Sequence, residues 1–130
     1  MITQSDIDII LYQDFSGLGM EVFSKKNAPK GKITSERVVT IVGKTSPDVI
    51  WVRTNVNIHI VIPDLDDNGL ANEIRIGEVQ KMLGKYASVC GSYKGENYIY
   101  ERIGEEVKSG DYCHYIDLEY SFETLNLLKS

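Results

Sequence analysis

The chain has 130 residues, which predicts a single domain spanning residues 1–130. Hydrophobic residues make up 42% of it and charged residues 25%, as in an average soluble domain, and no apolar stretch is long enough to cross a membrane. The net charge is −5 without a basic block, which argues against a nucleic-acid-binding surface. The first residues lack the basic and apolar regions of a signal peptide, so we expect none.

The first half of the chain predicts one helix and three strands. The helix begins at Ser5, whose hydroxyl can cap it, and ends near Asp14. Segments rich in β-branched residues predict the strands, and polar or Pro-containing segments predict the connections. After the helix we expect a strand over Met20–Phe23, a loop over Lys25–Lys32, a strand over Glu36–Val42, a turn over Gly43–Asp48 and a strand over Val49–Ile62.

The strand predicted over Val49–Ile62 has the clearest pattern in the chain. Successive side chains of a strand point to opposite faces of the sheet, so the alternation separates two sets of residues. One set is apolar and should form a wall of the core: Ile50, Val52, Val56, Ile58, Ile60 and Ile62. The other set is largely polar and should be either solvated or packed against a partner: Trp51, Arg53, Asn55, Asn57 and His59.

The second half predicts a helix over Leu70–Ala87, a loop bracketed by Gly91 and Gly95, and an antiparallel hairpin of two strands, Asn97–Val107 and Tyr112–Leu125. The apolar stripe of the helix should consist of Ile74, Val79, Met82, Leu83 and Tyr86. The buried face of the last strand should consist of Tyr112, His114, Ile116, Leu118, Tyr120 and Phe122. The elements together predict an α+β fold: a mostly antiparallel β-sheet with two helices packed on one face, in the order α-β-β-β-α-β-β.

The segment Asp64-x-Asp66-x-Asn68-Gly69 matches the first half of a calcium-binding loop. The position of the bidentate glutamate is occupied by Arg75, and a strand rather than a helix precedes the loop. Asp64, Asp66 and Asn68 are therefore only weak metal candidates. We interpret the segment as a strand-to-helix connection in which these side chains form turns and cap the helix, and we expect no cofactor.

The sequence displays no catalytic site. His59 and His114 fall on faces that should not converge, and neither has an evident nucleophile or orienting carboxylate. Asp117, Glu119 and Glu123 fall on one face of the last strand, and two carboxylates at positions i and i+2 there would be roughly 7 Å apart. This spacing falls between the two geometries of glycoside hydrolases, so we interpret the row as a solvated or lumen-facing acidic surface.

The two cysteines, Cys90 and Cys113, form no CxxC pair and provide too few thiolates for an all-cysteine zinc site. A single disulfide between them is possible on sequence grounds. We expect two free thiols in a reducing cytoplasm.

Two features indicate an interaction surface. Trp51 and Arg53 share the polar face of their strand, and these two residue types dominate the binding energy of protein interfaces. Tyrosines are concentrated in residues 86–115, a composition as typical of strands as of interfaces. The candidate interface residues are Trp51, Arg53, Asn55, Asn57, Tyr98, Tyr100 and Tyr115.

The succession of segments also carries a family resemblance. A short leading helix is followed by a strand before a loop (Gly19–Phe23), a strand pair ending in a V-I-P-D run (Ile58–Asp64), a Gly-Leu-led helix (Gly69–Tyr86) and a closing antiparallel pair (Tyr98–Val107 and His114–Leu125). In this order, over nearly the whole chain, the segments resemble the phage tail terminator family, the tail-completion and head–tail joining proteins of long-tailed phages. The polar loop Lys25–Lys32 is longer than in many members of that family.

The resemblance implies a structural virion protein of a phage or prophage and not an enzyme. Such a protein assembles as a homo-oligomeric ring, typically a hexamer, on the last ring of the tail tube, and joins it to the head–tail connector. Its partners would be the tail-tube protein and the connector protein, without any membrane. DNA would pass through the lumen, where acidic walls would repel its phosphates. The protein would be located in the virion, and in the host bacterial cytoplasm during assembly.

Two other functions remain open from the residues alone. One is another non-enzymatic oligomeric connector or adaptor domain. The other is a small enzyme or ligand-binding domain, which a deep pocket gathering His59, Asp64 or Glu119 would favour.

Overall fold

The chain folds into helices and strands over the residues that the computed structural model describes, 2–47 and 51–125. The first half contains α1 (Gln4–Phe15), a short 3-10 helix (Ser16–Leu18), β1 (Glu21–Ser24), β2 (Arg37–Pro47) and β3 (Trp51–Pro63). The second half contains α2 (Glu73–Met82), a second 3-10 helix (Leu83–Tyr86), β4 (Ser88–Tyr93), β5 (Glu96–Gly110) and β6 (Cys113–Leu125).

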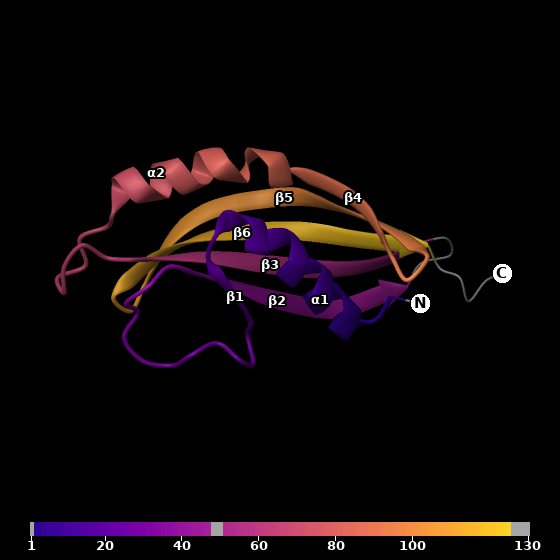
Figure 1. Ribbon diagram of the computed structural model, residues 1–130, viewed down its shortest axis with the longest axis horizontal. Coiled ribbons are helices and arrows are strands. Elements are labelled where there is room, and N and C mark those ends of the chain that lie inside the picture. Colours follow the sequence, from indigo (N-terminus) through magenta and orange to yellow (C-terminus); the bar gives the residue numbers. More distant parts are fainter. Residues whose placement is uncertain (1, 48–50, 126–130) are drawn as a thin grey trace.

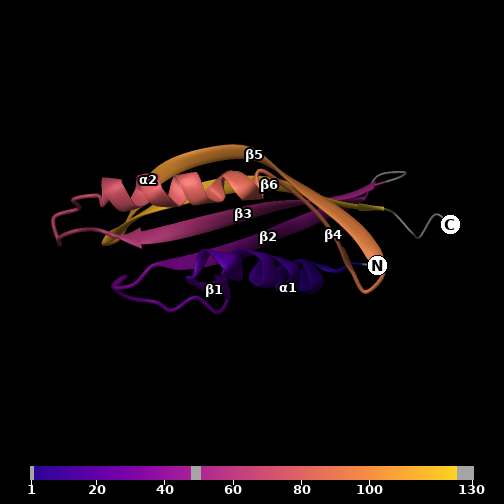
Figure 2. The same cartoon turned by 45° about the horizontal axis from the view of Figure 1, so that its top comes forward.

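The strands form one curled sheet in the order β1-β2-β3-β6-β5-β4 (Figure 1). β1 pairs with β2 in parallel, and every other neighbouring pair is antiparallel. α1 packs beside β1 and β2, while α2 runs along the β5 side of the sheet (Figures 1 and 2). The predicted α+β class and the order of its elements are confirmed, with β4 as an additional strand.

The long central strands β3 and β6 pair in unbroken register from Trp51 opposite Leu125 to Pro63 opposite Cys113. The predicted alternation is confirmed on both strands, because the apolar side chains of one parity join a single buried cluster. These are Val56, Ile58, Ile60 and Ile62 of β3 and Ile116, Leu118, Tyr120 and Phe122 of β6. Ile50 lies outside the described residues, and Tyr112 sits in the turn before β6, where it is exposed.

α1 begins one residue before the predicted start because Thr3, not Ser5, caps it. The Thr3 hydroxyl accepts a hydrogen bond from the Asp6 amide (3.1 Å), and the Asp6 carboxylate accepts one from the Thr3 amide (2.9 Å). This reciprocal pair satisfies two amides that the first helical turn leaves free, and it lowers the pKa of Asp6. The buried face of α1 consists of Ile7, Ile10, Leu11 and Phe15.

α2 is shorter than predicted. Asn72 caps it by accepting a hydrogen bond from the Arg75 amide (3.2 Å), so the helix starts at Glu73 rather than Leu70. Val79, Leu83 and Tyr86 are buried as predicted, together with Ile76. Ile74 and Met82 were wrongly placed in the buried stripe: they lie on other sides of the helix and are exposed.

Two segments predicted as connections belong to strands. β2 continues past Val42 through a β-bulge, so the turn predicted over Gly43–Asp48 is wrong for residues 43–47, and Asp48 lies outside the described residues. Gly43 permits this close strand pairing, because a Cβ there would lie 2.8 Å from the Asn55 carbonyl oxygen. Gly91 lies inside β4 rather than at the start of a loop.

Buried tyrosine hydroxyls connect the helices to the sheet. Tyr100 donates to the Asp14 carboxylate (2.7 Å), Tyr86 donates to the Asp14 carbonyl (2.9 Å) and Tyr120 donates to the Tyr86 carbonyl (2.8 Å). The rings of Phe15 and Tyr86 stack with centroids 4.5 Å apart. Burial raises the pKa of Tyr100 and of Tyr120, so both remain neutral donors.

β5 contains one extra residue relative to β6. Arg102 is opposite Tyr120 and Gly104 is opposite Glu119, so Ile103 has no partner in the ladder. In the part of the chain that the structure describes, no helix is both long and apolar enough to cross a membrane.

Candidate functional site

One face of the sheet packs against α1 and α2, and the other carries no helix among the described residues. We call the second face the open face. Its side chains come from alternate positions of the central strands, so its composition follows from the same parity that builds the core. It includes Trp51, Arg53, Asn55, Asn57 and His59 of β3, Tyr115, Asp117, Glu119, Ser121 and Glu123 of β6, and Ile99, Glu101, Glu106 and Lys108 of β5.

Asp117 is the centre of a polar cluster on the open face. Its side chain is only 14% exposed, yet it accepts hydrogen bonds from Asn57 Nδ2 (3.0 Å) and Lys108 Nζ (3.0 Å) and lies 3.3 Å from His59 Nε2. Burial alone would raise the pKa of Asp117, but these donors and neighbouring positive charges outweigh it and lower the pKa. Asp117 is therefore a fixed negative charge that organises its neighbours.

His59 is held between Asp117 and Tyr115. Its ring centroid lies 4.6 Å from that of Tyr115. Burial lowers the pKa of His59 more than the Asp117 carboxylate raises it, so the imidazole is neutral at pH 7. The expectation that no carboxylate lies near His59 is wrong, because Asp117 sits directly opposite it in the β3–β6 ladder.

An acidic area adjoins this cluster on β5 and β6. Glu101, Glu106 and Glu119 are exposed. Glu123 lies at one end of the same rows and forms an ion pair with Arg53 (3.0 Å). The solvated acidic row predicted on the last strand is confirmed only for Glu119, because Asp117 lies in the cluster and Glu123 is half-buried in its ion pair with Arg53. The exposed glutamates repel phosphate groups.

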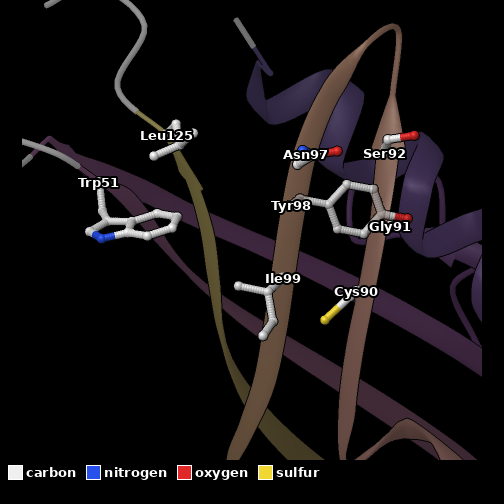
Figure 3. A pocket seen from close by; sticks show the side chains of 8 residues that line it. All are labelled: Trp51, Cys90, Gly91, Ser92, Asn97, Tyr98, Ile99 and Leu125. Atoms are coloured by element: carbon white, nitrogen blue, oxygen red, sulfur yellow. The ribbon is translucent and has the colours of Figure 1, made fainter.

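The open face ends in an apolar hollow of about 580 Å³. We call its four main side chains, Trp51, Cys90, Ile99 and Leu125, the socket. Ile99 lies opposite Cys90 in the β4–β5 ladder, and Trp51 lies opposite Leu125 in the β3–β6 ladder (Figure 3). Trp51 is 38% exposed and Leu125 46% exposed, so large apolar groups face solvent here.

Five of the predicted interface residues lie on the open face. Trp51, Arg53 and Asn55 are exposed, whereas Asn57 and Tyr115 are half-buried in the cluster around Asp117. Their shared location follows from strand parity alone.

The prediction that Tyr98 and Tyr100 belong to the interface is wrong. Tyr100 is fully buried, and Tyr98 stacks on Phe122 with centroids 5.2 Å apart, so both belong to the core side of β5. Tyr100 therefore cannot contact a partner in this conformation. The sequence prediction did not include Ile99, Leu125 or Cys90. Ile99 could have been identified, because it is next to Tyr100 in one strand and therefore faces the opposite side of the sheet.

The weak metal candidates have other partners. Asp64 pairs with His114, with its Oδ1 2.6 Å from Nδ1. The Asp66 carboxylate accepts hydrogen bonds from the amides of Asn68 (2.9 Å) and Leu70 (3.2 Å), forming the turn that was expected, although Asn72 rather than Asn68 caps the helix. Within residues 2–47 and 51–125 no group of three or more potential ligands is arranged to hold a metal ion.

His114 also has a carboxylate partner that the sequence did not reveal, because Asp64 is 50 residues away in the chain. It lines a groove of about 280 Å³ between α2 and the end of β5. His59 lies on the open face and His114 on the opposite side of the sheet, so the prediction that the two imidazoles do not converge is confirmed. Cys90 is an exposed free thiol in the socket, and Cys113 is a buried free thiol whose pKa is raised by burial.

Comparison of the chain with protein-family models and with curated proteins finds no match.

Proposed function

We propose that this chain is a structural assembly protein of the phage tail terminator type, which forms a homo-oligomeric ring on the end of the tail tube and joins it to the head–tail connector. The observation that carries the proposal is the open face: a long two-stranded surface that no described helix covers, ending in the apolar socket. A monomeric protein gains nothing by exposing Trp51 and Leu125 together, whereas an interface gains binding energy from burying them.

The two histidines support the proposal because each is held by a carboxylate. His59 is bound to Asp117 and His114 is bound to Asp64, on opposite faces of the sheet. The acidic area of Glu101, Glu106 and Glu119 supports a surface past which DNA moves without binding.

The deciding experiment mixes the purified protein with tail-tube protein from the same phage or prophage and images the tubes by negative-stain electron microscopy. We expect a cap at one end of each tube and a defined tube length. Light scattering coupled to size exclusion gives the oligomeric state of the capped and free protein. Tubes that continue to grow, with both ends bare, would reject the terminator function in favour of another adaptor or a ligand-binding domain.

A further inference from the structure

The loop between β3 and α2 presents apolar side chains to solvent. Leu65 is 61% exposed, Leu70 57% and Ile74 82%. The Leu65 amide donates a hydrogen bond to the Leu70 carbonyl (2.8 Å), so these two residues are adjacent, and Ile74 follows in the first turn of α2. We call these three residues the knob.

The knob is held in a fixed shape. The Asp66 carboxylate bonds the amides of Asn68 and Leu70, and Gly69 adopts the left-handed conformation that the turn requires (φ 85°). The base of the loop is tied to the sheet by the contact between Asp64 and His114. A preformed loop loses little conformational freedom on binding, so exposed apolar groups on it are suited to recognition.

The socket and the knob lie at opposite ends of one strand. β3 begins at Trp51 in the socket and ends at Pro63, just before the knob (Figures 1 and 3). Its 13 residues separate the two by roughly 40 Å at 3.3 Å per residue. A copy of the chain therefore cannot fill its own socket with its own knob, but it can fill that of a neighbour.

We propose that the knob of one copy binds the socket of the next, so that the chain associates with itself head to tail. Two different patches on one subunit generate a heterologous contact, which closes into a ring or continues as a filament. This inference rests on the proposed function only in taking a second copy of the chain as the partner.

Charge favours a second copy as the occupant. Residues 64–73 contain four acidic residues and no Lys or Arg, and they remain net negative after the ion pair between Asp67 and Lys32 (2.6 Å) is counted. The socket end carries exposed cations, Lys44 in the bulge of β2 and Lys94 in the β4–β5 turn, beside Arg53 of β3, which is paired with Glu123. The acidic loop also disfavours an anionic membrane surface as the partner of the knob, because the phospholipid headgroups would repel it.

The test uses the native thiol of Cys90, which lies in the socket. The substitution Leu70→Cys places a second thiol in the knob, and the concentrated protein is then treated with copper phenanthroline or with a short bismaleimide. A disulfide forms only when the two Cα atoms are within about 7 Å. We expect a ladder of linked dimers, trimers and longer species on a non-reducing gel, because each subunit offers one thiol at each end.

Two matched controls decide whether the contact is the proposed one. The double variant Leu70→Cys with Cys90→Ser should lose the ladder, and Ile9→Cys, which places an exposed thiol on α1, should give none. No ladder from Leu70→Cys, or a ladder that persists without Cys90, would overturn the proposal. Leu70 is exposed, and an unchanged circular dichroism spectrum confirms that the variants are folded.

A mixing experiment tests the head-to-tail geometry. Leu70→Asp disables the knob and Trp51→Glu disables the socket, so neither variant should assemble alone. Their mixture retains one intact knob and one intact socket, and should form a heterodimer and nothing longer. Failure of the mixture to associate would contradict the heterologous contact. If the protein forms the Cys90-dependent ladder but does not cap tubes, the head-to-tail contact is supported and the terminator function is rejected. If it caps tubes without forming the ladder, the terminator function is supported and this contact is rejected.

Discussion

Asp117 shows how one carboxylate can determine the properties of a surface. Three side chains from the two neighbouring strands, β3 and β5, converge on it, so a residue that alternation places on a solvated face becomes mostly buried. His59 is forced into the same partly dehydrated space and remains neutral. Protonation of His59 would therefore place a positive charge in the partly dehydrated cluster on the open face.

We predict that the free energy of unfolding falls as the pH is lowered from about 7.5 to about 5, and that His59 causes part of this loss. The pKa of His59 is lowered below its ordinary 6.5 by burial, so below 6.5 the unfolded chain binds more protons than the folded chain. Urea unfolding across this range should give a shallower slope for His59→Gln. The pKa of Asp117 is lowered below 3.8, so its contribution is lost only in stronger acid, as the pH falls through that lowered pKa. If the wild type and the His59→Gln variant lose stability equally as the pH falls, His59 does not contribute to the loss.

The hydroxyl of Tyr100 is the second residue whose role can be measured directly. Tyr100→Phe should lower the free energy of unfolding by about 1–3 kcal/mol, because it removes a buried hydrogen bond to the Asp14 carboxylate and leaves that carboxylate without the donor. Chemical denaturation measures the loss. Tyr12→Phe, at a position 57% exposed, is the control and should change nothing. A stability equal to the wild type would mean that the bond does not hold α1 to β5.

At the scale of elements, period-two alternation was the most reliable signal. It predicted β3 and β6 because their apolar and polar residues alternate over many positions. It failed where glycine interrupts the pattern: Gly43 in β2 and Gly91 in β4 were interpreted as loop residues, although Gly43 permits the close approach of the β3 backbone and Gly91 leaves room for the Tyr98 ring. The helix ends were displaced because several residues could serve as caps, and only the hydrogen bonds of Thr3 and Asn72 distinguish among them.

β4 gives an element-scale prediction. A Cβ at position 91 would overlap the tip of the Tyr98 ring, so Gly91→Ala should displace Tyr98 from its stack on Phe122. We expect a loss of about 1–3 kcal/mol from this overpacking, measured by urea unfolding.

Gly77→Ala is the matched control for Gly91→Ala. Gly77 lies in the interior of α2, and a Cβ there would meet open space. The same substitution should therefore stabilise the protein by about 0.5–1 kcal/mol, because alanine is the better helix former. Equal effects of the two substitutions would show that the contact with Tyr98 is not what excludes a side chain from position 91.

For the whole molecule, the sequence predicted which face is open but not how its residues are grouped. Parity placed Trp51, Arg53 and Asn55 correctly. The grouping of Ile99, Leu125 and Cys90 with Trp51 depends on the pairing of β5 with β6 and of β4 with β5, which local pattern does not encode. The carboxylate partners of the two histidines were missed for the same reason.

The acidic area predicts how the molecule behaves toward DNA. The wild-type protein should not retard duplex DNA in a gel-shift assay, even at low salt, because Glu101, Glu106 and Glu119 repel phosphates. Replacing all three by Lys should produce retardation that disappears as salt is added. Salt-sensitive binding by the wild-type protein would contradict the assignment of this area.

The unpaired residue in β5 has a consequence for how α2 is fastened. In a regular strand residues 102 and 105 would point to opposite faces, but Ile103 restarts the alternation and places Arg102 and Glu105 on the same side. They form an ion pair (2.9 Å), while Arg102 also donates to the Leu83 carbonyl and Glu105 accepts from Gln80 (3.1 Å). The bulge at Ile103 thus keeps the contacts that join the end of the second helix to the sheet, whereas drawing Ile103 into the ladder as a paired residue would turn Glu105 outward and release that end.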